Sequence, residues 1–98
     1  MSLPVVLTAE AEADLDDAVQ WYERRSAGLG VDLVAKVRQT LARVGGNPDL
    51  YPEVESGVRR APVRRFPYGV LYRRRGGRVE VIAVFHDRRD PAVWQGRV

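Results

Sequence analysis

The sequence predicts an α+β fold with the order strand, antiparallel helical hairpin, three-stranded antiparallel meander and short C-terminal helix. Three observations predict it. Apolar residues recur at helical spacing in the first half of the chain and alternate at strand spacing in the second half. Glycine and proline residues separate these segments, as turns require. The 98 residues, 45% of them hydrophobic, are enough for one hydrophobic core, so we expect a single domain over residues 1–98.

The first half is predicted to begin with a strand and to continue as two helices. Residues 3–7 form an apolar run that is too short for a helix. Thr8 can then cap a helix whose first turn contains two glutamates, which the helix dipole favours. This helix ends near residues 27–28, and a second one begins within residues 29–32 and is stopped by the Gly45–Gly46 pair. Because only a few residues join the two helices, they form an antiparallel hairpin.

The second half contains three strand patterns. Residues 49–57 are polar and turn-like, so we expect a loop there. The strands are predicted over residues 58–65, 68–74 and 79–86. Pro62 cannot donate a hydrogen bond to a ladder, which predicts an edge position or a bulge at that point of the first strand.

The last of these strands is predicted to lie inside the sheet, because both of its faces are largely apolar. Strict alternation places Val79, Val81, Ala83 and Phe85 on one face and Glu80, Ile82, Val84 and His86 on the other. Residues 75–78 make the hairpin turn that precedes it. After it, Asp90 and Pro91 open a short helix that holds Trp94.

Charge is unevenly distributed along the chain. Residues 1–53 contain nine acidic and five basic residues, whereas residues 54–98 contain four acidic and eleven basic ones, so the two parts carry −4 and +7. Fifteen of the sixteen basic residues are arginine, Lys36 being the exception. Arginine forks bind phosphate and carboxylate groups. The basic half therefore predicts nucleic acid or an acidic protein as the partner.

Composition argues against several classes of protein. The chain has no cysteine and one histidine, which argues against disulfides, a thiol nucleophile and a zinc site. Three aspartates, at positions 14, 16 and 17, are predicted on a helix surface without converging ligands, so we expect neither a metal nor a cofactor. No signal-peptide pattern opens the sequence, and no run approaches the ~20 apolar residues of a membrane span. We therefore expect a cytoplasmic protein.

One candidate for chemistry is His86, at the end of the last strand, because histidine titrates near neutral pH. Ribonuclease action needs only a base, an acid and positive charge, since the ribose 2′-hydroxyl is itself the nucleophile. The candidate catalytic set for this chemistry is His86, Arg64, Arg65, Tyr72 and Arg73. Arg88 and Arg89 could hold a phosphate beside the histidine. The alternative is a basic face that is solvated or that binds an acidic partner.

Several segments, in this order, resemble the RelE/ParE superfamily of type II toxin–antitoxin toxins. The segments are LTAEAEADLDDAVQWYE, NPDLYP, RRAPVRRFPYGVLYR and VIAVFHDRRDPAVW. The resemblance covers nearly the whole chain, and its implied fold is the one predicted above. It implies a small basic toxin that a cognate antitoxin neutralises by lying in an apolar groove between helices and sheet, with operator DNA bound only through the antitoxin.

The superfamily includes two kinds of toxin. ParE-like members act on DNA gyrase without catalytic residues, whereas RelE-like members cut mRNA on the ribosome. The opening LTAEAEADL and the single lysine favour the ParE-like kind, and the catalytic set above applies only to the alternative, a RelE-like endonuclease. The residues expected to contact the target or the antitoxin are Arg59, Arg60, Arg88, Arg89, Trp94, Arg97, Val5, Leu15, Val19 and Leu33.

Overall fold

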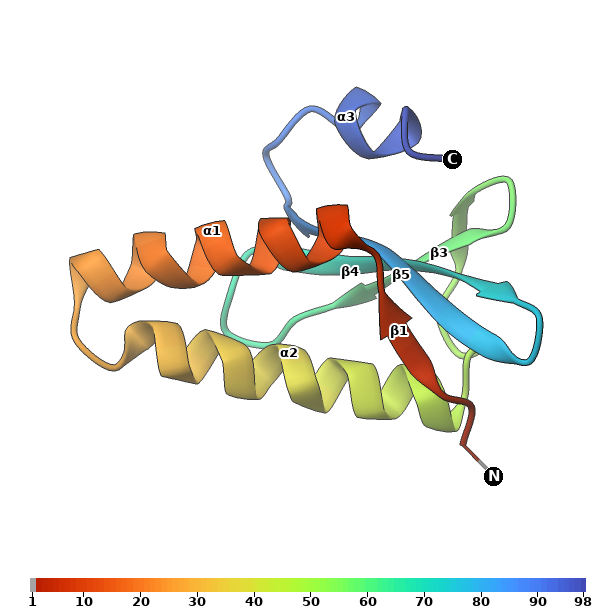
Figure 1. Ribbon diagram of the computed structural model, residues 1–98, viewed down its shortest axis with the longest axis horizontal. Coiled ribbons are helices and arrows are strands. Elements are labelled where there is room, and N and C mark those ends of the chain that lie inside the picture. Colours follow the sequence, from red (N-terminus) through yellow and green to blue (C-terminus); the bar gives the residue numbers. More distant parts are fainter. Residues whose placement is uncertain (1) are drawn as a thin grey trace.

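The computed structural model describes residues 2–98 and shows a helical hairpin packed on one face of a mixed sheet (Figure 1). The elements are β1 (Val5–Leu7), α1 (Ala9–Arg25), α2 (Leu29–Gly46), β2 (Glu53–Glu55), β3 (Val58–Pro62), β4 (Tyr68–Arg75), β5 (Arg78–His86) and α3 (Ala92–Gln95). The sheet order is β1-β5-β4-β3-β2. β1 pairs with β5 in parallel, and the other pairs are antiparallel. The predicted interior position of the last strand is therefore confirmed.

Local signals explain the helical hairpin. The Thr8 hydroxyl accepts a hydrogen bond from the Ala11 amide at 3.1 Å, which is the predicted cap of α1. At the other end of α1, the Glu23 carboxylate accepts hydrogen bonds from the amides of Gly28 and Gly30, at 2.8 and 2.9 Å. Glu23 therefore satisfies two amide groups at the start of α2 and fixes the turn between the helices.

The sheet has one strand more than the sequence predicts. Residues 53–55, which we expected in a loop, form β2 and pair with β3. Glu53 lies opposite Arg59, and Gly57, with φ +77°, makes the intervening turn. All three residues of β2 are exposed, so no buried face produces an alternating pattern that would identify this strand from sequence.

The strand predicted over residues 58–65 is shorter than expected. β3 ends at Pro62, which pairs with Gly69 of β4 and lies beyond the residues that pair with β2. Pro62 thus occupies a locally unpaired edge, as its missing amide requires. Arg64 and Arg65 lie in the following turn, so the expectation that they alternate across a strand is wrong.

A β-bulge changes which residues of β5 share a face. The register against β4 shifts at Ile82, which has no direct partner. Val81 and Val84 consequently both pack in the core beneath the helical hairpin, and Ala83 and Phe85 pack on the opposite face. The predicted strict alternation is therefore wrong at this point, because the bulge adds one residue to the strand.

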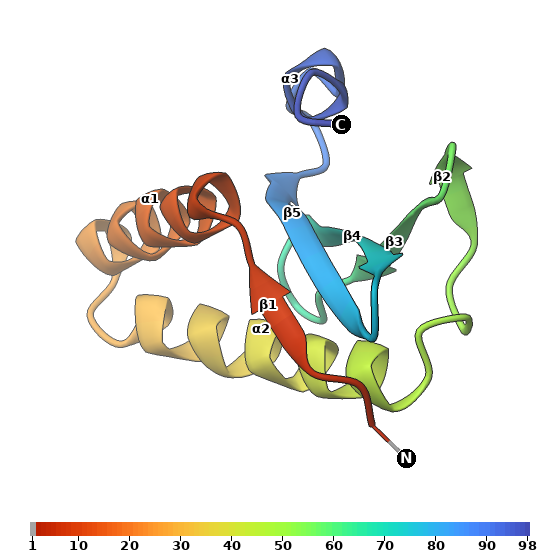
Figure 2. The same cartoon turned by 45° about the vertical axis from the view of Figure 1, so that its right-hand side comes forward.

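The two faces of the sheet are covered by different elements. The larger core lies between the sheet and the α1–α2 hairpin and includes the fully buried Leu33, Val37 and Tyr72. On the other face, Trp94 of α3 packs with Phe85 and other apolar residues. Figure 2 shows α3 and α2 on opposite sides of the strands. As predicted, Asp90 begins this last turn: its carboxylate accepts a hydrogen bond from the Ala92 amide at 2.9 Å.

Candidate functional site

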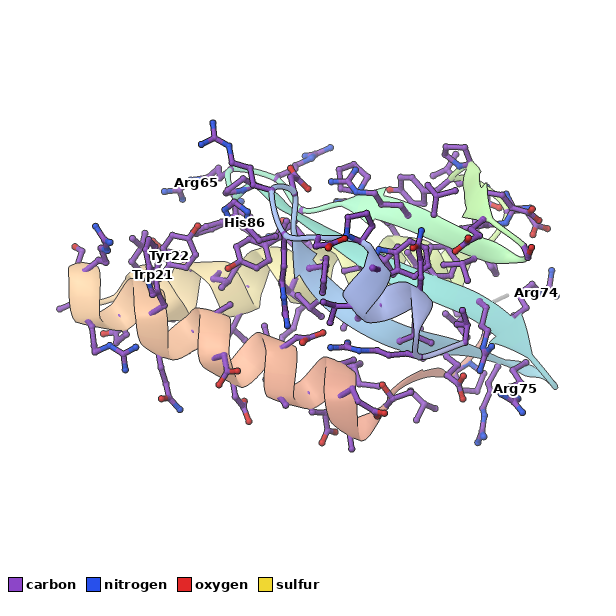
Figure 3. The ribbon with its side chains drawn as sticks, turned by 90° about the horizontal axis from the view of Figure 1, so that it is seen from above. Trp21, Tyr22, Arg65, Arg74, Arg75 and His86 are labelled. Atoms are coloured by element: carbon purple, nitrogen blue, oxygen red, sulfur yellow. The ribbon has the colours of Figure 1, made fainter. Side chains whose placement is uncertain are left out.

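The arginines of the second half of the chain lie at two separate ends of the sheet. Arg65 lies at the same end as His86, whereas Arg74 and Arg75 lie at the opposite end, where β4 turns into β5 (Figure 3). β4, eight residues long, separates the two groups. These three arginines therefore belong to two groups at opposite ends of the sheet, and Arg59, Arg60 and Arg73 lie on the strands between them.

Several of these arginines are paired with carboxylates of the same chain. Arg60 forms an ion pair with Asp87, and Arg73 forms one with Glu80 at an N–O distance of 2.9 Å. Asp49 lies within 4 Å of two further guanidinium groups, those of residues 59 and 74. Much of the charge that the sequence concentrates here is thus balanced within the molecule.

Three arginines at one end have no such partner. Within residues 2–98, Arg64, Arg65 and Arg88 form no ion pair, and all three are exposed. They lie on adjacent turns, because the Asp87 amide donates a hydrogen bond to the Pro67 carbonyl at 2.8 Å. We call this group, Arg64, Arg65 and Arg88, the arginine pole.

Arg65 has an unusual backbone conformation. Its φ is 69°, in the left-handed region, and it is the only non-glycine residue with positive φ in the described part of the chain. This conformation costs a residue with a Cβ atom about 1 kcal/mol relative to glycine. The turn is held by a hydrogen bond from the Val63 amide to the Tyr68 carbonyl at 2.9 Å.

An aromatic cluster borders the arginine pole (Figure 3). Its rings, each in edge-to-face contact with at least one other, are Trp21, Tyr22, Phe66, Tyr68 and His86. Trp21 is 45% exposed, and the Arg25 guanidinium lies 4.1 Å from its ring centre. At the pole, the Arg65 guanidinium lies 6.0 Å from the centre of the Phe66 ring. The cluster therefore has cationic side chains at both ends.

A cleft of about 350 Å³ opens between α1 and the end of β5, beside this cluster. Its walls include Ala18, Trp21 and Val84, and Asp17 is its exposed acidic residue. The Tyr68 hydroxyl makes no hydrogen bond to any group of residues 2–98, although its ring lines the cleft. Burial, with the nearby Tyr22, raises the pKa of Tyr68, so this hydroxyl stays protonated at neutral pH.

His86 also lines this cleft, and its ring is held by the turn that follows β5. The ring nitrogen Nδ1 accepts a hydrogen bond from the Arg88 amide at 3.0 Å. The neutral ring therefore carries its proton on Nε2 and offers a donor there. A general base at Nε2 needs a free lone pair on that atom. The observed hydrogen bond thus does not suit a general base at Nε2, whereas a general acid would use the proton on that atom.

The predicted catalytic set is not brought together. Tyr72 is fully buried beneath the helical hairpin, where its hydroxyl donates to the Pro48 carbonyl at 2.7 Å and burial raises its pKa. Arg73, the next residue of β4, faces the opposite side of the sheet and pairs with Glu80. Arg64 and Arg65 lie on the turn described above. Neighbouring strand residues point to opposite faces, which is why Tyr72 and Arg73 cannot share a site.

Two of the predicted contact residues have structural roles in the fold. Trp94 is only 6% exposed, because it packs on the sheet. Arg97 donates to both carboxylate oxygens of Asp14, at 2.6 and 3.0 Å, and this bonding raises its pKa. Asp14 also accepts a hydrogen bond from the Val84 amide. The expectation that Asp14 lies on an exposed helix surface is wrong, since its side chain is 6% exposed.

The four apolar residues predicted to contact the antitoxin lie in or against the core. Leu33 is fully buried, and Val5, Leu15 and Val19 pack against the same core. None of the four lines the cleft between α1 and the end of β5. The remaining predicted contact residues keep partly exposed side chains: Arg59, Arg60, Arg88 and Arg89.

Sequence reasoning missed the parts of the cleft that come from different elements. Neither Trp21 nor Tyr68 is among the site residues predicted from the sequence. The cleft joins them with His86 because Tyr68 pairs with His86 across β4 and β5. No spacing in the sequence signals this arrangement.

Within residues 2–98, no three acidic or histidine side chains are grouped to hold a metal ion. Over the same residues, the helices are too short or too polar to cross a bilayer.

The chain is similar to known proteins in its sequence and in its fold. Residues 5–91 match the family model described as the ParE toxin of the type II toxin–antitoxin system parDE. The fold is similar to that of a chain in a solved structure described as the chromosomal ParDE TA system from P. aeruginosa, with a TM-score of 0.77 and 18% sequence identity. The similarity covers 87% of this chain and 96% of that chain. No curated protein sequence matches this one.

Proposed function

Because the chain belongs to the ParE toxin family, we propose that it is the toxin of a type II toxin–antitoxin system and that it inhibits DNA gyrase by a protein–protein contact. The family match carries this proposal. It spans residues 5–91, which include every strand and both long helices. On this proposal the chain acts in the cytoplasm, and a cognate antitoxin neutralises it and supplies the contact to operator DNA.

The geometry supports inhibition by binding rather than by chemistry. The residues suggested for RNA cleavage lie in a buried core, on the opposite sheet face and on a turn. The one histidine uses Nδ1 to accept a backbone hydrogen bond. No observation favours the mRNA endonuclease alternative, so we propose the gyrase inhibitor alone.

The test is expression of the chain without an antitoxin, with DNA-damage signalling and protein synthesis followed in the same culture. We expect early damage signalling and filamentous cells while translation continues. The purified chain should also inhibit supercoiling by gyrase. An immediate stop in translation with cleaved messages would contradict the proposal, and so would the absence of any growth effect.

Tyr72→Phe is a suitable variant for this test. It removes a hydroxyl that an endonuclease of the suggested kind would use, and it keeps the buried ring in place. We expect growth arrest to persist in this variant. Removing residues 94–98 is a poor test, because the deletion takes away the buried Trp94 and the ion pair of Arg97 together with any contact surface.

A further inference from the structure

We infer that the arginine pole and the adjoining aromatic cluster form a docking surface for an acidic peptide segment of the antitoxin, with Arg65 as the main anchor. This inference rests on the proposed function, because it names the part of the toxin that the neutralising partner covers. Four features of the structure lead to it.

The first feature is unbalanced charge. Arg60, Arg73 and Arg89 each have a carboxylate partner within the chain. Arg64 and Arg65 have none among residues 2–98, although they lie on an exposed turn. Their guanidinium groups keep all their hydrogen-bond donors free for the carboxylates of another molecule.

The second feature is the strained backbone of Arg65. Glycine would adopt a φ of 69° without penalty, yet this position carries a long charged side chain. That side chain makes no ion pair and no hydrogen bond to residues 2–98, and its guanidinium lies 6.0 Å from the centre of the Phe66 ring, at the limit of cation–π attraction. Unexplained strain of this kind is characteristic of residues that function in binding.

The third feature is the neighbouring aromatic surface. Trp, Tyr and Arg are the residues that most often dominate the binding energy of protein interfaces. Here the half-exposed Trp21 and the Tyr68 ring line a cleft of about 350 Å³, large enough for an apolar side chain. The free Tyr68 hydroxyl and the Nε2 donor of His86 can fix the backbone of the segment that enters it.

The fourth feature decides between an acidic peptide and nucleic acid. Affinity for a phosphate backbone grows with the number of phosphates that cationic side chains neutralise. Three free arginines can neutralise only a few phosphates, and because the exposed Asp17 lies at the cleft, the carboxylates of a bound segment must lie at the arginine pole. A short segment with an apolar residue next to two or three carboxylates fits both the cleft and the pole.

The test compares Arg65→Gly with the wild type. Glycine removes the guanidinium but relieves the left-handed backbone, so the variant should melt at an unchanged or higher temperature. Binding is measured by calorimetry with the purified product of the open reading frame that adjoins this gene. We expect Arg65→Gly to weaken binding about tenfold or more, because charge-assisted hydrogen bonds are lost. The affinity of Arg65→Lys should lie between those of the wild type and Arg65→Gly.

Two further variants make the result specific. Arg88→Ala, at the pole, should also weaken binding, whereas Arg78→Ala, on the exposed hairpin at the far end of the sheet, should not. If Arg65→Gly and Arg88→Ala both bind like the wild type, the inference is wrong and the proposed function stands. A wild type that neither arrests growth nor binds the adjoining product would overturn both. The same variants are also titrated with a single-stranded oligonucleotide that carries the same net charge as the adjoining product. If they lose affinity for the oligonucleotide but bind the protein like the wild type, the partner of this surface is nucleic acid and not a peptide.

Discussion

Asp14 connects the beginning and the end of the chain through one buried carboxylate. It lies on α1, and its oxygens accept hydrogen bonds from the Arg97 guanidinium, 83 residues away in sequence. It also binds the Val84 amide in the middle of the molecule. Both side chains are largely buried, so each charge depends on the other for its stabilisation.

Asp14→Asn tests this dependence. The change keeps the shape of the side chain but leaves the Arg97 guanidinium without its counter-charge in a mostly buried position. We expect the free energy of unfolding to fall by about 3 kcal/mol. The measurement is urea unfolding, with Asp16→Asn on the exposed face of the same helix as the control, where we expect a change within about 0.5 kcal/mol. Equal effects at the two positions would contradict this account.

At the scale of elements, the close approach of α1 and α2 depends on Gly30. A Cβ atom built at this position would lie 2.8 Å from the Val19 carbonyl oxygen, which is backbone and cannot rotate away. Gly46, in the last turn of the same helix, has nothing within 4 Å of its Cβ position and no positive φ. Close packing of the helices therefore requires glycine at position 30 but not at position 46.

Alanine at these two positions should have opposite effects. Gly30→Ala is expected to lower the free energy of unfolding by about 2 kcal/mol, because the helices must separate. Gly46→Ala should raise it by up to about 1 kcal/mol, because alanine loses less backbone entropy in a helix. Chemical denaturation of both variants in the same buffer measures the difference. Stabilisation by both changes would show that the helices tolerate the extra methyl group.

The elements that could be predicted from sequence are those specified by neighbouring residues. Thr8, the glycines after each helix and the 75–78 turn are local signals, and the helical hairpin and the last β-hairpin follow from them. β2 could not be predicted, because its three exposed residues are defined only by their pairing with β3. The bulge at Ile82 depends on the register between two strands, which no single strand encodes.

The same distinction explains the candidate site. Arginine was correctly expected to concentrate near the end of the chain, but composition cannot show which arginines have intramolecular partners. Asp87 and Glu80 neutralise two of them across the sheet. The burial of Trp94 and the ion pair of Arg97 likewise depend on where α3 packs. Pairings between distant residues therefore decide what remains exposed for binding.

At the scale of the whole molecule, buried tyrosines link stability to alkaline pH. Burial raises the pKa of Tyr22, Tyr68 and Tyr72 above the ordinary value of 10.0. Above the unfolded-state pKa, the unfolded chain has released these phenolic protons while the folded chain still retains them. The folded state then binds more protons, so its stability falls as the pH rises.

We therefore expect the free energy of unfolding to decrease once the pH exceeds about 10. The contribution of the protonated tyrosines to the free energy of unfolding is fully present below their unfolded-state pKa. It is lost as the pH rises through their folded-state pKa values. Tyr72→Phe removes the hydrogen bond to the Pro48 carbonyl, so its free energy of unfolding at neutral pH should be about 1 kcal/mol lower than that of the wild type. The same variant should show a shallower alkaline decrease. Urea unfolding between pH 8 and pH 11 measures both effects, and an unchanged slope in the variant would contradict the assignment.

The ion pair of Asp14 and Arg97 also completes the hydrogen bonding at the edge of the sheet. β1 ends at Leu7, but β5 continues beyond it, and the Ile82 carbonyl and Val84 amide would otherwise remain unpaired there. Arg97 donates to that carbonyl at 2.9 Å, and Asp14 accepts from that amide at 3.1 Å. Two side chains thus take the place of the next residue of a strand. An open edge is a template for strands of other molecules, and at this point of β5 these two side chains occupy the groups that such a strand would bind.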